Sequence, residues 1–203
     1  MKMRMSLTCG AVVALLCLTA TAGFATNVLT NPGFETGDLT GWQVFGLGAN
    51  SSVTVVADNG PSQGGTHCVY MDNHAEALGL TMKQTTAPGT GAPGLVYWSF
   101  DLKAGPAAVG GVFFVQVFAE QTSGGIVATS GLLGNYATAG WNNYSGSFMA
   151  PATTGFMTIQ FMCNTGAATG SISKMYVDNV AVSQQPIVPD EPTSWGAVKG
   201  LFR

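Results

Sequence analysis

Short apolar runs, separated by clusters of Gly, Pro, Asn and Ser, recur along the chain from residue 27 to residue 183. The runs are rich in Val, Phe, Tyr, Thr and Ile, and none keeps a helical period over a useful length. Short runs bounded by turn residues at regular intervals are typical of an antiparallel β-sandwich. The pattern predicts strands at residues 27–30, 42–49, 52–57, 66–72, 78–86, 95–103, 111–121, 126–132, 141–149, 155–163 and 174–183.

Two of these runs indicate which side chains face the core. The run at 95–103 alternates strictly, with Val96, Trp98, Phe100 and Leu102 on one face and Tyr97, Ser99, Asp101 and Lys103 on the other. A strand has a side-chain period of two, so we expect the first face to be buried and the second to be wet. The run at 111–121 carries apolar side chains on both faces, which indicates a central strand or one that lines a cleft.

The composition narrows the function classes. The chain has 203 residues, of which 28 are Gly and only 8% are charged, whereas about 25% are charged in typical soluble domains. Seven Lys and Arg against ten Asp and Glu give a net charge of −3, so no basic surface is available for a nucleic-acid backbone. The scarcity of charge also excludes a helical bundle, and the 46% hydrophobic content excludes a disordered chain.

Residues 1–25 have the three-part pattern of a secretory signal peptide. Lys2 and Arg4 precede an apolar run from Leu7 to Leu18, and small residues lead to Ala25. The apolar run is shorter than the roughly 20 residues that a bilayer span needs. We therefore expect cleavage after Ala25, or else after Ala22, and no membrane span. The expected location is extracellular or at the cell surface, with the periplasm as the other compartment.

The part that follows the predicted signal peptide is more acidic than the whole chain and contains two cysteines. Without residues 1–25, five basic and ten acidic residues remain, for a net charge of −5. Cys68 and Cys163 also remain. In an exported protein they form a disulfide if the fold brings them together; otherwise they are buried free thiols that behave as small hydrophobes. The sequence leaves both alternatives open.

The composition changes after Ser183. Pro186, Pro189 and Pro192 fall within seven residues, and prolines at this density remove backbone donors and favour an extended linker. We therefore expect one β-sandwich domain at residues 26–183, followed by a Pro-rich linker and a short C-terminal tail at residues 184–203. The tail is a candidate docking segment for a protein partner.

Carboxylates stand near both ends of the predicted domain. Glu35 lies in a Gly-rich first turn, and Asp178 lies in the last predicted strand. If these two segments are neighbours in the sandwich, the carboxylates repel each other unless a cation lies between them. Calcium takes six to eight oxygen ligands and suits such a turn. The alternative is that both carboxylates cap turns by accepting hydrogen bonds from backbone amides.

Asn27-Val-Leu-Thr-Asn-Pro-Gly-Phe-Glu-Thr-Gly-Asp-Leu-Thr-Gly-Trp42 and Met175-Tyr-Val-Asp-Asn-Val-Ala-Val-Ser183 resemble the two ends of carbohydrate-binding modules of families 4, 9 and 22. Those modules are antiparallel β-sandwiches of the jelly-roll, galactose-binding-domain-like type. The resemblance implies an all-β fold of this type for the chain. It also implies a structural calcium held by the Gly33 carbonyl and the carboxylates of Glu35 and Asp178. Asp58 is the further ligand that we expect.

In the resembling modules, an aromatic-lined cleft on one sheet binds glycan chains. Aromatic rings stack on the C–H groups of sugars, while amides and carboxylates hydrogen-bond the hydroxyls. We expect one sheet face to bind the sugar. The candidates on the polar face or in loops are Tyr97, Asp101, Gln116, Glu120, Tyr136, Asn142 and Gln160. We assign the remaining large aromatics Trp42, Trp98, Trp141 and Phe148 to the core or its rim.

The function that the sequence favours is a secreted, non-catalytic carbohydrate-binding module whose partner is a polysaccharide or glycan. The alternative is a structural or cell-surface interaction protein that uses the same fold without a sugar site. A glycosidase needs two carboxylates that converge across a cleft, and Asp101 and Glu120 are the pair that could meet on one sheet. His67 and His74 have no nucleophile motif beside them, so no catalytic residue is predicted.

Overall fold

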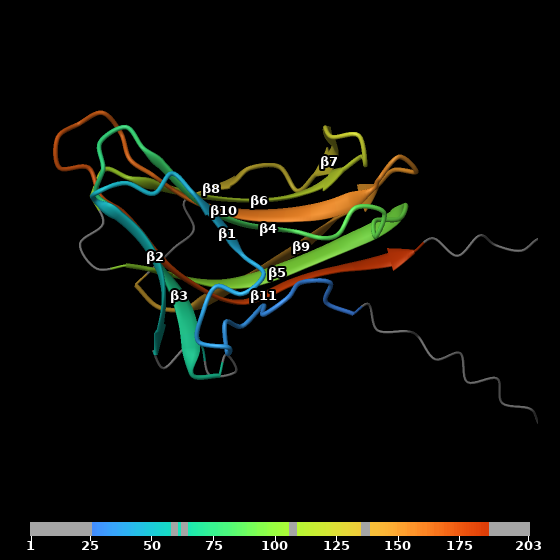
Figure 1. Ribbon diagram of the computed structural model, residues 1–203, viewed down its shortest axis with the longest axis horizontal. Helices are drawn as coiled ribbons and strands as arrows, with labels where there is room; N and C mark the ends of the chain where they lie inside the picture. Colours follow the sequence, from blue (N-terminus) through green and yellow to red (C-terminus); the bar gives the residue numbers. More distant parts are fainter. Residues whose placement is uncertain (1–25, 58–60, 62–64, 106–108, 135–138, 187–203) are drawn as a thin grey trace, which may run out of the picture.

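The computed structural model describes residues 26–57, 61, 65–105, 109–134 and 139–186. The strands of these ranges form two antiparallel sheets that lie as two layers in Figure 1. In chain order the strands are β1 Gln43–Phe45, β2 Ser51–Ala57, β3 His67–Asn73, β4 Gly79–Thr85, β5 Gly94–Ala104, β6 Val112–Glu120, β7 Ile126–Thr129, β8 Leu133–Gly134, β9 Asn142–Ala150, β10 Phe156–Asn164 and β11 Ser173–Pro186. The predicted all-β sandwich is confirmed.

One sheet has six strands in the order β1-β4-β10-β6-β7, and β8 also pairs with β6. Its centre is β10, which pairs with β4 on one side and with β6 on the other. The β-branched and aromatic side chains of β6 and β10 suit a pleated, half-buried surface. Their alternation buries Val115 and Phe161 against the other sheet and turns Gln116 and Gln160 to the outer face.

The other sheet has five strands in the order β2-β3-β11-β5-β9. The alternation predicted for β5 is confirmed, since Val96, Phe100 and Leu102 are buried and Trp98 packs against the core. Tyr97 is exposed on the outer face. β5 lies between β11 and β9, so its outer face is flanked by a paired strand on each side.

The last strand is longer than the sequence predicts. Gln184, Gln185 and Pro186 keep the pairing register with β5, so β11 continues three residues beyond Ser183. The predicted signal peptide at residues 1–25 and the remainder of the predicted tail at residues 187–203 lie outside the described residues. Among the residues that are described, no helix has the length and the apolar character that a membrane span requires.

Aromatic side chains from both sheets meet in the core. The ring centroid of Phe161 on β10 lies 5.5 Å from that of Phe100 on β5, edge to face, and 6.1 Å from that of Trp42. The Trp42 ring also lies 5.3 Å from Phe34 in the first turn. Such pairs add about 0.5–1.5 kcal/mol to the stabilisation that comes from area burial. The core therefore joins both sheets to the N-terminal turn.

The N-terminal segment, residues 27–35, lies between the two sheets at one edge of the sandwich. On one side Asn27 forms a bridge with Ser183 of β11, and the Val28 amide donates to the Val182 carbonyl at 2.8 Å. On the other side the buried Gln84 side chain of β4 accepts from the Thr30 amide at 2.6 Å and donates to the Thr30 carbonyl at 2.9 Å. Residues 27–30 therefore do not form the predicted strand, because their hydrogen bonds are divided between two sheets.

Two further expectations are decided by packing. Cys68 and Cys163 are buried and are not joined by a disulfide, so the second of the alternatives that the sequence left open holds. Burial raises the pKa of the Cys163 thiol to about 12, and a buried thiol of this kind is unreactive. Trp141, which we assigned to the core or its rim, lies outside the core. Its ring packs against Tyr176 and under the Lys103 ammonium, and both of these side chains lie on the outer face of the five-stranded sheet.

Phe161→Ala should lower the free energy of unfolding by about 3–5 kcal/mol, because truncation of a buried Phe loses apolar burial and leaves a cavity. Phe161 is fully buried, and its ring lies against Phe100 of the other sheet and against Trp42, which directly precedes β1. Urea unfolding measures the change. The control is Leu47→Ala at an exposed position, where a change within about 0.5 kcal/mol is expected. Equal losses in the two variants would contradict this account of the core.

Candidate functional site

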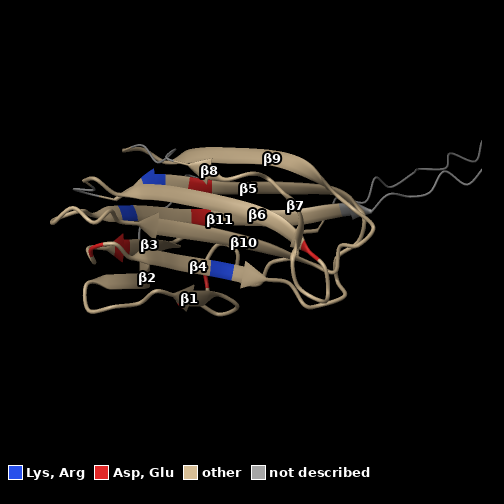
Figure 2. Ribbon diagram, turned by 90° about the horizontal axis from the view of Figure 1, so that it is seen from above, with Lys and Arg blue, Asp and Glu red and all other residues tan. Residues whose placement is uncertain are grey.

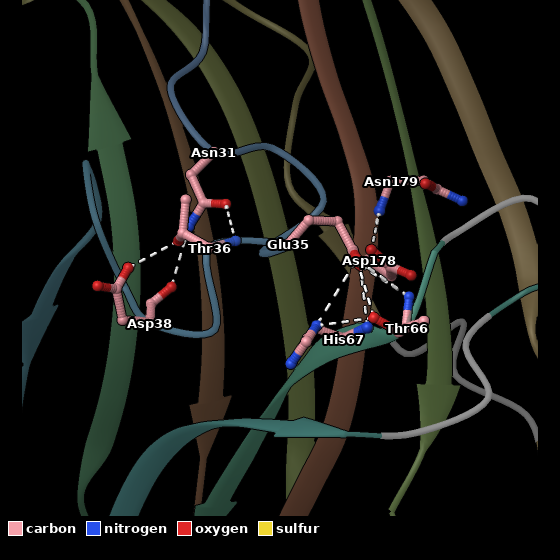
Figure 3. A network of polar contacts seen from close by, with 8 residues as sticks. All are labelled: Asn31, Glu35, Thr36, Asp38, Thr66, His67, Asp178 and Asn179. Carbon is pink, nitrogen blue, oxygen red and sulfur yellow. Dashed lines mark hydrogen bonds and ion pairs between the residues drawn. The ribbon is translucent and has the colours of Figure 1, made fainter.

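Glu35 lies in the first turn and accepts hydrogen bonds at the start of β3 (Figure 3). Its carboxylate accepts from the Thr66 amide at 3.0 and 3.1 Å, from the Thr66 hydroxyl at 3.1 Å and from the His67 amide at 2.9 Å. The backbone amide of His67, and after it that of Thr66, donates to the ionised carboxylate. These hydrogen bonds lower the pKa of Glu35 below its ordinary value. Glu35 therefore fulfils the capping role that we gave as the alternative to calcium binding.

The backbone on both sides of this contact is specialised. Phe34 has a φ of 57°, and its ring is fully buried, so it anchors the turn in the core. Gly65 has a φ of 87°, which favours glycine, and a Cβ at this position would collide with the Glu35 carboxylate. The position of Glu35 thus depends on a buried anchor before it and a glycine opposite it.

Asp178 is fully buried at a bulge in β11. Its Oδ1 accepts a hydrogen bond from the Asn179 amide at 2.7 Å, and Asn179 has a φ of 47°. Its Oδ2 is buried and has no hydrogen-bond partner among the described residues. Burial is the main cause that raises the pKa of Asp178 to about 7; the Asn179 amide lowers it, and the charges of Asp101 and Glu35 raise it.

The first turn lies against this carboxylate. A Cβ on Gly33 would lie 3.8 Å from Asp178 Oδ1, and the Pro32 carbonyl accepts a hydrogen bond from the Val180 amide at 3.0 Å. The structure thus brings the predicted residues Gly33, Glu35 and Asp178 to one place, while Asp58 lies outside the described residues. Figure 2 shows a further acidic segment beside it, on β5, where Asp101 pairs with Asp178.

The oxygen atoms around Asp178 meet some of the requirements of a hard cation such as calcium, but not all of them. An unpartnered, buried carboxylate oxygen needs either a proton or a positive charge, and calcium takes carboxylate and carbonyl oxygens. Within the described ranges, however, no group of three or more His, Cys, Asp or Glu side chains is arranged to hold a metal ion. A calcium ion would therefore need backbone carbonyls, such as that of Gly33, and water as ligands.

Three of the predicted sugar-binding residues, Gln116, Glu120 and Gln160, share the outer face of the six-stranded sheet. Gln160 on β10 pairs with Gln116 on β6, and Gln160 Nε2 donates to Gln116 Oε1 at 3.2 Å. Gln116 Nε2 in turn donates to the Thr129 hydroxyl at 3.2 Å. Glu120 lies further along β6, where its carboxylate accepts from the Thr158 hydroxyl at 2.6 Å. Polar groups thus form a continuous row across the central strands.

Lys83 and Phe45 extend this row, and neither was predicted from the sequence. Lys83 on β4 pairs with Gln160 on one side and with Gln43 of β1 on the other. Its Nζ lies 5.1 Å from the centroid of the Phe45 ring, which is 49% exposed. The alternation along β4 could have shown that Lys83 faces outwards. The position of Phe45 has no local signal, because it depends on the pairing of β1 with β4. We call Lys83, Gln160, Gln116 and Thr129 the amide row.

Two more of the seven candidates, Tyr97 and Asp101, lie on β5 of the five-stranded sheet, so the predicted residues do not form one site. Asp101 is buried, and its carboxylate accepts from Asn143 at 2.9 Å and from Asn179 at 2.7 Å. Because β5 and β6 belong to different sheets, the prediction that Asp101 and Glu120 could meet on one sheet is wrong. Tyr136 lies outside the described residues.

No protein-family model and no curated protein matches this chain. Solved structures do match. One is the enzymatically active domain of tailspike protein 4 from bacteriophage CBA120, with a TM-score of 0.64 and 14% identity over 78% of this chain and 21% of that chain. This chain therefore spans about a fifth of the tailspike chain.

Two carbohydrate-binding modules match over nearly their whole length. One is a family 61 module in complex with β-1,4-galactotriose, with a TM-score of 0.55 and 20% identity over 79% of this chain and 100% of the module. The other is the CBM22-1 xylan-binding domain of Xyn10C from Paenibacillus barcinonensis, with a TM-score of 0.54 and 13% identity over 81% of this chain and 97% of that domain. The chain has the β-sandwich fold of carbohydrate-binding modules, and at these identities the likeness is one of fold.

Without divalent cations, Asp178 should make the protein less stable as the pH rises from about 4 to 7. The unfolded chain releases this proton near the ordinary pKa of 3.8, whereas the folded chain keeps it up to about 7. The folded state then binds more protons, so the free energy of unfolding falls with pH. The lowered pKa of Glu35 has the opposite sign but acts around and below its ordinary value of 4.5.

Unfolding measured with a chelator at several pH values tests this prediction. Asp178→Asn should remove the decrease between pH 4 and 7, because an amide does not titrate. A difference in stability between the variant and the unchanged protein that stays constant over this range would contradict the assignment.

Proposed function

We propose that this protein is a secreted, non-catalytic carbohydrate-binding module that holds glycans on the outer face of its six-stranded sheet. The observation that carries the proposal is the amide row, with the exposed Phe45 ring at one end. Side-chain amides and an ammonium group offer both donors and acceptors to sugar hydroxyls. An exposed ring offers a flat apolar surface to the C–H groups of a sugar.

The central strands are a suitable support for such a surface. β10 is paired on both sides, so the spacing between Lys83, Gln160 and Gln116 is set by the backbone ladder. Groups that are held in place before binding lose less conformational entropy when the ligand arrives. Glu120 adds a carboxylate acceptor, which the Thr158 hydroxyl already orients.

The similar structures and the N-terminal sequence support the same function. One similar module is in complex with β-1,4-galactotriose, and another is a xylan-binding domain. We therefore propose neutral plant-type polysaccharides as the first ligands to test. The pattern of residues 1–25 supports export, and with it a location outside the cytoplasm where such polymers are found.

We also propose a structural calcium ion between the first turn and the last strand. The Gly33 carbonyl and the carboxylates of Glu35 and Asp178 would hold it, with Asp58 as a further ligand. The support is the buried Asp178 Oδ2, which lacks a hydrogen-bond donor. The ion would supply positive charge to a carboxylate that burial otherwise keeps protonated up to about pH 7. Its ligands come from both ends of the domain, so its effect would be on stability.

Gln116→Ala and Gln160→Ala should each weaken glycan binding about tenfold or more, because the loss of one direct hydrogen bond to a ligand costs about 1–2 kcal/mol. Isothermal titration with β-1,4-galactotriose, xylohexaose and cellohexaose measures the affinity. The matched control is Gln121→Ala, which removes the same side chain in the turn after β6 and should leave the affinity unchanged.

The result that would overturn this site is an affinity that neither Gln116→Ala nor Gln160→Ala changes. If none of a broad panel of glycans binds, the alternative function gains support, namely a cell-surface interaction protein whose C-terminal tail, residues 187–203, binds a protein partner. Deletion of residues 187–203 would then abolish surface association.

Calcium should raise the melting temperature of the protein, because a ligand that binds only the folded state stabilises it by about 2.7 kcal/mol at 100 times its Kd. Glu35→Gln and Asp178→Asn should remove this calcium response. Asp38→Asn is the matched control: Asp38 lies in the same turn, but its carboxylate accepts hydrogen bonds from Thr36 and Thr40. Thermal unfolding in calcium and in chelator that gives the same melting temperature would refute the ion.

A further inference from the structure

A hollow of about 390 Å³ lies on the outer face of the five-stranded sheet, on the side of the sandwich opposite to the amide row. Three neighbouring strands, β11, β5 and β9, form it. The outward-facing side chains that line it are Tyr97, Ser99, Ser145, Ser147, Ala181 and Ser183. We call it the Tyr97 hollow.

The pairing register gathers these side chains into two rows. Tyr97 pairs with Ser183 on one side and with Ser147 on the other, and Ser99 pairs with Ala181 and with Ser145. Neighbouring rows on one face of a sheet are about 7 Å apart. On the inner side of the sheet the Trp98 ring lies against Gly146 so closely that a Cβ there would collide with it. The indole therefore separates the hollow from the core.

The serine hydroxyls of the Tyr97 hollow differ from those of Ser51 and Ser173, which bond to the protein itself. Ser51 donates to the Gly46 carbonyl at 3.3 Å, and Ser173 donates to the Val112 carbonyl at 3.1 Å. Within the described part of the chain, the serine hydroxyls that line the hollow make no hydrogen bond to the protein. Each hydroxyl can donate once and accept twice, so this surface can serve a ligand rich in hydroxyls.

The lining also defines the charge and the size of the ligand. None of the described residues that line the Tyr97 hollow carries a charge, so the ligand that we expect there is neutral. Tyr97 is 39% exposed and offers a ring on which the C–H face of a sugar can stack. Small-molecule sites have volumes of about 300–1,000 Å³, and the hollow is near the lower limit. It therefore suits a short segment of a glycan.

We propose that the Tyr97 hollow is a second carbohydrate site, which takes a neutral sugar unit. This proposal goes beyond the proposed function, because the hollow and the amide row are on opposite sheets and neither needs the other to bind. With sites on both faces, one molecule binds two glycan chains, and binding to a polysaccharide surface gains from the high effective concentration of the second site.

Titration of the ¹⁵N-labelled protein with β-1,4-galactotriose, xylohexaose and cellohexaose tests the proposal by NMR. We expect saturable shifts of the Ser99, Ser145 and Ser147 amides, separate from those of the amide row. Tyr97→Ala should weaken binding at the hollow about tenfold or more, because the stacking surface is lost, and should leave the shifts of the amide row unchanged. Tyr97→Phe keeps the ring and should retain most of the affinity.

Two further variants separate binding from folding. Ser145→Val removes a hydroxyl while it keeps good strand propensity, and it should weaken binding at the hollow without loss of stability. Met149→Ala is the matched control, because Met149 is exposed on the same strand and face but does not line the hollow. It should leave the affinity unchanged.

The proposal is overturned if no amide of β5, β9 or β11 near the hollow shifts at about 10 mM of any probe, a concentration that would nearly saturate a site with a Kd of 1 mM. It is also overturned if the shifts persist unchanged in Tyr97→Ala and Ser145→Val. Shifts at the hollow without shifts at the amide row would support this proposal and contradict the proposed function. The reverse result would overturn this proposal and leave the proposed function intact.

Discussion

The rest of the structure depends on the way in which residues 27–35 are held between the two sheets. The Gln84 side chain is buried. Its amide oxygen accepts a hydrogen bond from the Thr30 amide, and its amide nitrogen donates one to the Thr30 carbonyl. A buried polar group that loses its partner costs about 1–3 kcal/mol, so this contact is maintained in the folded state. On the other side Asn27 and Val28 bond β11. Because hydrogen bonds join the segment to both sheets, the Phe34 ring lies in the core. Glu35, the next residue, then lies beside the start of β3 and accepts its amide hydrogen bonds.

The two carboxylates that this arrangement brings to one place differ in their surroundings. Glu35 accepts several hydrogen bonds, whereas one oxygen of the buried Asp178 has none among the described residues. A carboxylate in that position is neutralised by a proton or by a cation. The two compete for the same oxygen, so a bound cation removes the pH dependence that the proton creates. Asp178 lies in the bulge beside Val180, whose amide donates a hydrogen bond to the Pro32 carbonyl. The ionisation of Asp178 is therefore coupled to the docking of the first turn, whose Glu35 charge raises its pKa.

The parts of the fold that depend on local pattern could be predicted from the sequence. The side-chain period of two in a strand was enough to predict β5 and β6 as strands. It was also enough to predict which side chains of β5 are buried. The strand order is a non-local property. Asp101 and Glu120 were expected on one sheet, yet β5 pairs with β11 and β9 while β6 pairs with β10. The two-residue β8 is too short to leave a pattern.

The candidate sites show the same limit. Gly33, Glu35 and Asp178 were expected together because two motifs at the ends of the domain resemble those of known modules, and the structure places them together. The amide row needs the registers of β4, β10 and β6, which the sequence does not encode locally. Lys83 and Phe45 were missed for this reason.

The scarcity of charged residues limits the kind of recognition that either sheet face can support. Several of the described charges already have partners: Asp72 pairs with Lys174 at 3.5 Å, and Lys83 lies over the Phe45 ring. At the proposed sites, recognition would then rest mainly on amides, hydroxyls and rings, to which Lys83 and Glu120 add one charge each. Hydrogen bonds from these polar groups to a ligand replace hydrogen bonds to water and leave a modest net gain. A rigid sheet keeps that gain by lowering the entropy lost on binding. At the proposed sites, affinity would therefore depend on the pairing registers that align these groups as well as on the side chains themselves.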